Sequence, residues 1–231
     1  MSATVTPGGS AATRLGRLAR QARTQNEARQ EHCEFCAQVI PPEHRHVLEL
    51  RSGELRCACR PCALLFDREG ARSGDFRTVG ERRWSLGDFR IDAERWQALG
   101  VPVDMVFFVR SSVHGRMRAL YPSPAGATEA ALDIRSWWAA LEAENPVLAR
   151  LTDDVEALLV DRVREHRRYF VVPIDDAYRM VALVRTHWRG IMGGTPLWRA
   201  VDAFFDDLAR SARPAPAGRD TPPTGGRKEA P

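Results

Sequence analysis

Apolar runs rich in β-branched and aromatic residues predict strands in the middle of the chain. These runs are residues 76–79 (FRTV), 103–109 (VDMVFFV), 113–121 (VHGRMRALY) and 169–174 (YFVVPI). The polar link around Ser111 and Ser112 predicts that the second and third runs form a hairpin. Pro173 cannot donate a ladder hydrogen bond, so we expect it at a sheet edge or at the end of its strand. Residues 153–163 (DDVEALLVDRV) fit a strand or a helix, because their apolar run has no clear period.

Four segments with helical spacing of apolar residues predict helices. They are residues 92–99, 129–144, 175–188 and 195–212. Asp92 is the expected N-cap of the first helix, and Asp175 or Asp176 that of the third, because an aspartate oxygen accepts from the free N–H groups there. Thr195 followed by Pro196 predicts the start of the last helix. Neighbouring strands with helices around them predict an α+β body with a mainly antiparallel sheet.

All five cysteines of the 231-residue chain lie between residues 33 and 62. Cys33 and Cys36 form one CxxC pair, and Cys59 and Cys62 form another. Two such pairs at this separation are a specific signal, because each turn directs two sulfurs toward one point and two turns complete the tetrahedron that Zn²⁺ accepts. Four cysteines buried as small apolar side chains would not explain the double spacing. We therefore predict a metal site made of these four thiolates.

The residues around the cysteines predict the shape of this module. Residues 44–50 and 53–58 read as short strands joined by a turn, and Pro61 predicts the first turn of a helix over 60–67. A knuckle, a hairpin and a helix whose start carries the second pair resemble a treble clef. A zinc ribbon, with the second pair on another hairpin, is the alternative.

Three histidines and the fifth cysteine lie near the four predicted ligands. In a strand, Cys57 would share a face with Cys59, and we expect it to be a spare thiol because the site takes four ligands. His32, His44 and His46 are expected at the surface or behind the ligands.

Four thiolates leave no open position for water, so they favour a structural zinc over a catalytic one. HNH-type nucleases carry a catalytic His on a treble clef, and His46 of the segment EHRH lies roughly where that residue would be. The following segment, CALLFDREGAR, carries no Asn or His, which disfavours the nuclease. Rubredoxins hold iron with two CxxC knuckles and transfer single electrons. Their knuckles are normally followed by Gly, whereas Ala37 and Ala63 stand here, so that resemblance is partial.

The body offers two further candidate sites. The segment YPSPAGATEAALDI (121–134) places Thr128 ahead of a helix expected to open at Glu129, whose N–H groups could hold an anion. A well-capped loop is the simpler interpretation. The second candidate group comprises Asp175, Asp176, Tyr178, Arg185, His187 and Trp188. Paired acids can perform acid–base chemistry or coordinate a cation, but helix capping explains them as well. His114 and His166 have no nucleophile beside them in the sequence.

Composition and charge narrow the class of protein. Apolar residues (44%) and charged residues (28%) are those of a soluble globular protein, and no apolar run suggests export or a membrane span. We therefore expect a cytoplasmic protein, in which clustered cysteines more often hold a metal than a disulfide. Residues 1–29 carry five Arg and one Glu, and residues 212–231 carry four basic and two acidic residues. The net charge of +4 thus belongs to the tails, and a nucleic-acid partner is not expected.

The same patterns divide the chain into four predicted parts. They are a flexible basic arm (1–29), a four-cysteine metal module (30–68), an α+β body (69–211) and a disordered tail (212–231).

Several motifs together resemble a family of uncharacterised bacterial proteins. The motifs are CEFC, EHRHVLEL, CACRPCALLFD, YPSPAGATE, NPVLARL, EALLV and VPIDDAYRMVALVRTHWRG, and they span roughly residues 30–211. That family is associated mainly with GC-rich actinobacteria and with gene clusters of a high-affinity nickel–iron hydrogenase, and it has no established activity. The resemblance implies an accessory role in hydrogenase maturation, assembly or electron transfer, with a hydrogenase subunit or maturation factor as the protein partner.

The residues and the resemblance together predict a non-catalytic metal-binding accessory or adaptor protein. Its cofactor would be a structural Zn²⁺ bound by Cys33, Cys36, Cys59 and Cys62. The alternative is a rubredoxin-like electron carrier with iron in the same four thiolates, and an HNH-type nuclease is the least favoured hypothesis.

Overall fold

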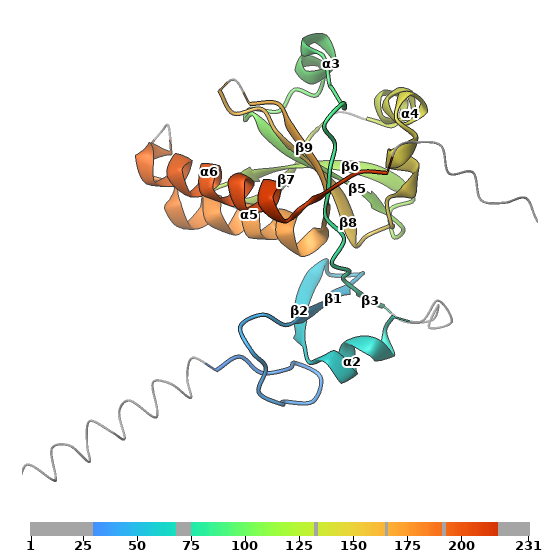
Figure 1. Cartoon of the computed structure of the whole chain (residues 1–231), viewed down its shortest axis with the longest axis vertical. Helices are drawn as coiled ribbons and strands as arrows, with labels where there is room; N and C mark the ends of the chain where they lie inside the picture. The colour runs from blue at the N-terminus through green and yellow to red at the C-terminus, as the bar shows by residue number, and fades with distance from the viewer. Residues whose placement is uncertain (1–29, 68–74, 132–133, 165, 191–192, 217–231) are drawn as a thin grey trace, which may run out of the picture.

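The chain folds into a small cysteine-rich module and a larger α+β body. The computed structural model describes residues 30–67, 75–131, 134–164, 166–190 and 193–216. The predicted N-terminal arm (1–29) and residues 217–231 of the predicted tail lie outside the described residues. Figure 1 shows the module, in blue and cyan, packed against one side of the body.

The module is a three-stranded sheet with one short helix. In chain order it contains β1 (Arg45–Glu49), β2 (Glu54–Ala58), α2 (Arg60–Leu65) and β3 (Phe76–Thr78). Strand β1 lies in the middle and pairs antiparallel with both β2 and β3. Gly53 closes the β1–β2 turn with φ +71°, a conformation that residues with a Cβ rarely adopt. The predicted hairpin and helix of residues 44–67 are confirmed.

The body is built on a seven-stranded sheet with the order β10-β4-β9-β8-β5-β6-β7. The strands are β4 (Trp84–Ser85), β5 (Met105–Ser111), β6 (Arg116–Ser123), β7 (Gly126–Glu129), β8 (Glu156–Asp161), β9 (Arg168–Pro173) and β10 (Arg213–Pro214). Every neighbouring pair is antiparallel except β10 with β4. The α+β class and the mainly antiparallel sheet are therefore confirmed, as is the β5–β6 hairpin. Pro173 ends β9, which is an interior strand and not an edge.

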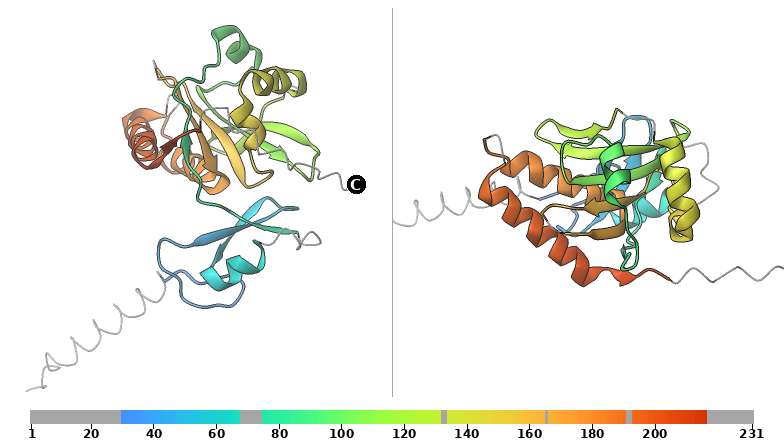
Figure 2. Two further views of the ribbon diagram at one scale, coloured as in Figure 1. Left: turned by 45° about the vertical axis from the view of Figure 1, so that its right-hand side comes forward. Right: turned by 90° about the horizontal axis from the view of Figure 1, so that it is seen from above.

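Helices cover both faces of this sheet (Figure 2). One face carries α5 (Ile174–His187) and α6 (Gly194–Ser211), and the other carries α3 (Ala93–Ala98), α4 (Arg135–Glu144) and the 3₁₀ helix η1 (Pro146–Arg150). Phe107 and Leu159 lie in the core beneath α5 and α6, whereas Phe108 and Leu158 lie in the opposite core. With both faces buried, β8 has no apolar–polar alternation. This explains why residues 153–163 fit either state from sequence.

The helix predicted over residues 129–144 begins later than expected. Residues Gly126–Glu129 form β7, which pairs with β6 after a tight turn, and the helix starts only at Arg135. Thr128 is therefore a strand residue whose Oγ1 lies 3.0 Å from Ser123 Oγ. The possible anion site at a helix start by Glu129, the less favoured interpretation of this segment, is therefore wrong, and the segment is a strand and not the capped loop that was preferred.

Two predicted N-caps are also wrong. Helix α5 already begins at Ile174, so Asp175 and Asp176 lie in its first turn. Helix α6 begins at Gly194 after Gly193, and Thr195 lies inside it. The Asp92 cap is confirmed, because its Oδ1 accepts from Arg95 N–H at 2.7 Å.

The module has a small core of its own, and one core of the body extends into it. Leu48 of β1 and Val79, which follows β3, are buried in the same cluster as the apolar faces of α5 and α6. Strand β3, which the predicted boundary at residue 69 assigns to the body, completes the module's sheet. Order also extends past residue 212, because Arg213 N–H donates to Arg83 O and Ala215 N–H donates to Ser85 O. No helix in the described part of the chain combines the length and apolarity that crossing a membrane requires.

Candidate metal centre

The first cysteine pair lies in a tight knuckle just before β1. Cys33 N–H donates to Gln38 O, and Ala37 N–H donates to Cys33 O, both at 2.8 Å. Ala37 adopts φ +61°, the left-handed conformation that normally favours glycine. The knuckle therefore keeps its turn with alanine in the position where a rubredoxin knuckle normally has glycine.

The second pair lies at the start of α2. Cys59 is the N-cap residue, Pro61 occupies the first turn, and Cys62 follows it. Ala63 N–H donates to Cys59 O at 3.0 Å, which closes the turn, and Thr78 of β3 donates its hydroxyl to Ala63 O at 2.6 Å. The second pair thus lies on a helix start and not on another hairpin.

Folding brings the four sulfurs of Cys33, Cys36, Cys59 and Cys62 together. All four Sγ atoms lie within 4.8 Å of one another, and those of Cys36 and Cys59 are 3.7 Å apart. Sulfurs bound at about 2.3 Å around a tetrahedral Zn²⁺ would be separated by about 3.8 Å. Cys33 and Cys59 are buried and Cys36 is exposed, so the cluster lies just below the surface. The cluster has the donor set and the spacing of a site that could hold a metal ion.

The four thiols have different surroundings, and their pKa values differ accordingly. Burial alone would raise the pKa of Cys33, but the backbone N–H groups of Cys59, Phe35 and Cys36 lower it to about 6. The neighbouring Cys59 thiol, followed by burial, raises the pKa of Cys62 to about 12. Four thiolates so close repel one another, and a bound dication offsets this repulsion.

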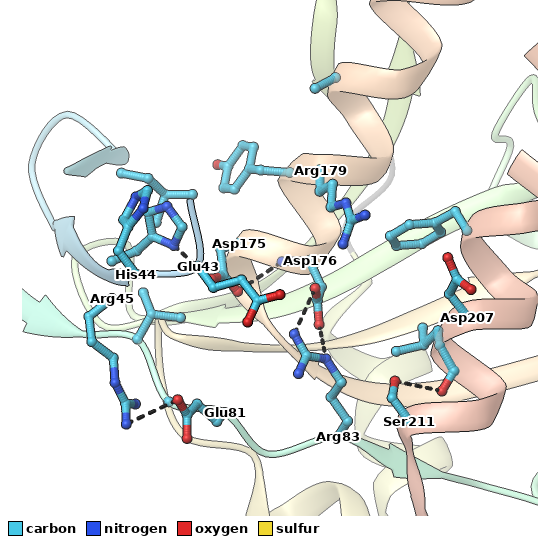
Figure 3. A pocket seen from close by; sticks show the side chains of 18 of the residues that line it. Glu43, His44, Arg45, Glu81, Arg83, Asp175, Asp176, Arg179, Asp207 and Ser211 are labelled. Atoms are coloured by element: carbon cyan, nitrogen blue, oxygen red, sulfur yellow. Dashed lines mark hydrogen bonds and ion pairs between the residues drawn. The ribbon is translucent and has the colours of Figure 1, made fainter. Parts of the chain in front are cut away.

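A cavity of about 1060 Å³ lies between the β1–β2 hairpin and the helices α5 and α6. Figure 3 shows Asp175 and Asp176 projecting from the start of α5 into this region. Asp175 Oδ2 lies 2.9 Å from His46 Nδ1. Arg83 holds both oxygens of Asp176, at 2.5 and 3.0 Å, and this hydrogen-bonded carboxylate raises the pKa of Arg83. Asp175 therefore attaches α5 to the module, and Asp176 attaches α5 to the segment between β3 and β4.

Of the other residues of the predicted acid–base group, Tyr178 also lines this cavity. Tyr178 packs edge-on against Phe107, and burial raises its pKa. His187 Nδ1 lies 3.1 Å from Leu183 O, and Trp188 Nε1 donates to Gly190 O. Arg185 is exposed on α5. Arg185, His187 and Trp188 do not line the cavity, so the six residues form no common site.

The two isolated histidines of the body also remain apart from the cavity. His114 Nδ1 lies 2.9 Å from Ser111 Oγ in the β5–β6 hairpin, and His166 lies 3.8 Å from Asp202.

One cluster was missed by the sequence analysis. One ligand atom each from His44, His46 and Cys57 lie within 4.8 Å of one another. A signal for it exists in the sequence, because His44 and His46 alternate along a strand and a hairpin centred on the Gly53 turn places Cys57 opposite His46. The contact of His46 with Asp175 spans 129 positions and has no local signal.

These features define an α+β protein with a four-cysteine cluster suited to a metal ion. The model of the "Family of unknown function (DUF5947)" matches residues 32–212, so the chain belongs to that family. None of the curated proteins and none of the solved structures with which it was compared matches the chain.

Proposed function

We propose that the four cysteines bind one structural Zn²⁺ in a treble-clef module. The observation that carries this proposal is the closed set of four sulfurs within 4.8 Å, with the second pair on the start of α2. Four thiolates leave no position for water or substrate, so the ion has a structural and not a catalytic role. The shape it fixes is the hairpin, whose Leu48 is part of the core under α5 and α6.

Metal analysis and a visible absorption spectrum of freshly purified protein test the identity of the ion. We expect one tightly held zinc per chain and no colour. Cys36→Ser should lose this zinc, and the matched variant Cys57→Ser should retain it. A red protein with one iron would overturn the structural account in favour of a rubredoxin-like electron carrier.

The proposed role is that of a non-catalytic accessory protein whose module docks onto a protein partner. Leu64 and Leu65 are adjacent on α2 and are 57% and 68% exposed. Contiguous exposed apolar side chains mark interaction surfaces more often than isolated ones do. The family resemblance supplies the candidate partner, a nickel–iron hydrogenase subunit or maturation factor in the cytoplasm.

A pull-down from the native host tests the partner. We expect the tagged full chain to capture a hydrogenase subunit or maturation factor, and Leu64→Glu with Leu65→Glu to abolish this capture. Val113→Glu is the matched control, because Val113 is equally exposed (53%) but lies in the β5–β6 turn of the body. Recovery of other proteins alone would contradict the hydrogenase assignment.

A further inference from the structure

The β1–β2 hairpin carries a second cluster of metal-binding side chains, separate from the four cysteines. His46 lies directly opposite Cys57 in the ladder, and His44 precedes His46 by two residues, so it points to the same side. The two imidazole rings are 4.8 Å apart, and one ligand atom from each of the three residues lies within 4.8 Å of the others. We propose that His44, His46 and Cys57 bind a second divalent metal ion of the zinc or cobalt type. This proposal is independent of the structural zinc.

Both histidines are oriented by an acceptor behind the ring. His46 Nδ1 lies 2.9 Å from Asp175 Oδ2, and His44 Nδ1 lies 2.9 Å from Pro41 O and 3.2 Å from Glu31 Oε2. A metal-binding histidine typically donates its second N–H to such an acceptor, which fixes the ring and makes the other nitrogen a better ligand. With Nδ1 occupied in both rings, Nε2 is the atom that each has left for a metal.

His44 provides an independent observation that points to a ligand. Its side chain is only 6% exposed, and its Nε2 is buried with no hydrogen-bond partner among the described residues. A buried polar atom without a partner destabilises the fold, because it has lost its hydrogen bonds to water and gained none in return. A metal ion bound through this nitrogen would remove that destabilisation.

The donor set and its position define the kind of ion. Two imidazoles and one thiolate suit zinc and its borderline neighbours, whereas magnesium and calcium prefer oxygen ligands. Three protein ligands leave a fourth position open, in contrast with the closed four-cysteine site. His44 and His46 both line the cavity of about 1060 Å³ beside α5, so the open position faces a space that admits a small ligand.

Metal titration of the full chain tests the second site. The protein is stripped with a chelator under reducing conditions, then titrated with Zn²⁺ and, in parallel, with Co²⁺, whose spectrum reports thiolate binding. We expect two ions per chain with two distinct affinities. His44→Ala with His46→Ala should remove the weaker ion and leave the tighter one. Asp175→Asn should weaken the weaker ion by about 10–100-fold, the usual effect of losing a partner behind a ligand.

The controls separate this proposal from the structural zinc and from misfolding. His166→Ala changes a surface histidine of the body and should retain both ions. Loss of the tighter ion in Cys36→Ser assigns that ion to the four cysteines. Retention of the tighter ion by a histidine variant then shows that the variant still folds. Saturation of the parent at one ion per chain overturns the proposal, and so does a second ion that binds the double histidine variant with unchanged affinity.

Discussion

Ala37 and Ala63 follow the two CxxC pairs, yet their backbones differ. Ala37 adopts φ +61° in the first knuckle, while Ala63 lies within α2 and is buried. The left-handed conformation costs an alanine about 1–2 kcal/mol, whereas a glycine adopts it freely. Identical residues at equivalent sequence positions therefore make opposite contributions to stability.

A pair of glycine substitutions tests this difference. We expect Ala37→Gly to raise the free energy of unfolding by about 0.5 kcal/mol, because relief of strain exceeds the entropy lost by a more flexible unfolded chain. Ala63→Gly should lower it by about 1 kcal/mol, since glycine is unfavourable inside a helix. Urea unfolding of both metal-bound variants measures the two changes. Equal destabilisation by both would contradict the role of backbone strain.

Glu129 shows how an ion pair makes a residue sensitive to pH. Burial alone would raise its pKa, but hydrogen bonds from Arg118 and Arg116 lower it below the ordinary value. The oxygens of Glu129 lie 2.8 Å from each guanidinium, across the antiparallel pair β6–β7. The pKa of Glu129 is lower in the folded than in the unfolded protein. Its ion pairs therefore stabilise the fold at pH values above the unfolded pKa, and this stabilisation is lost as the pH falls through the folded pKa.

Comparison of the parent with Glu129→Gln tests the expected direction of this pH dependence. The parent should be the more stable protein at pH 7, and the difference should shrink as the pH approaches 3. Urea unfolding across this range gives the difference directly. The exposed Glu94→Gln serves as the control and should show a smaller change. A difference that grows toward low pH would show that the ion pair does not stabilise the fold.

At the scale of elements, helix α5 is the hub that joins the two parts of the molecule. Its apolar side packs on the sheet and on α6, and its first turn bonds the β1–β2 hairpin through Asp175 and the segment before β4 through Asp176. The side chain of Asp176 is 8% exposed, and Arg83 forms two hydrogen bonds with it. Removal of either Arg83 or Asp176 would leave the charge of the other residue desolvated and without its partner.

Asp176→Ala should therefore lower the free energy of unfolding by about 2 kcal/mol, the usual cost of removing hydrogen bonds to a charged group. Asp207→Ala is the matched control, because Asp207 lies on α6 and forms an exposed pair with Arg210. The control should change stability by about 0.5 kcal/mol or less. Thermal and urea unfolding of both variants make the comparison, and equal effects would exclude a special role of the Arg83 contact.

At the scale of the whole molecule, we expect the four-cysteine module and the body to unfold as one cooperative structure. In the proposed function, a metal bound by the four sulfurs fixes the hairpin, and the hairpin contributes Leu48 to the core beneath α5 and α6, which also contains Val79. Loss of the metal should therefore loosen part of the body's core as well as the module. All six tryptophans lie between residues 84 and 198, so their fluorescence reports on the body alone.

Removal of the metal by a chelator under reducing conditions tests this coupling. Exposure of Leu48 and Val79 costs about 4 kcal/mol in total, and we expect the tryptophan-detected melting temperature to fall by about 10 °C. Re-addition of Zn²⁺ should restore it. An unchanged tryptophan transition in the metal-free protein would show that the body folds independently of the module.

Sequence patterns correctly predicted those turns, caps and hairpins that depend only on neighbouring residues. The Gly53 turn, the Pro61 helix start, the Asp92 cap and the β5–β6 hairpin depend on neighbouring residues, and each was predicted correctly. Thr195 was a misleading signal, because α6 already begins at Gly194, and it and the preceding Gly193 both have positive φ angles. Residues 126–128 were predicted as a loop and Glu129 as a helix start, but their pairing with β6, a tertiary contact that overrides local propensity, makes them a strand.

The sequence by itself determined the cluster of four cysteines, the class of fold and the antiparallel hairpins, because regular spacing and turn residues encode them. Only the tertiary structure decided that β8 is a strand buried on both faces and that Asp175 and Asp176 bond His46 and Arg83. These contacts join segments far apart in the chain, so they depend on how the elements pack and on no local pattern.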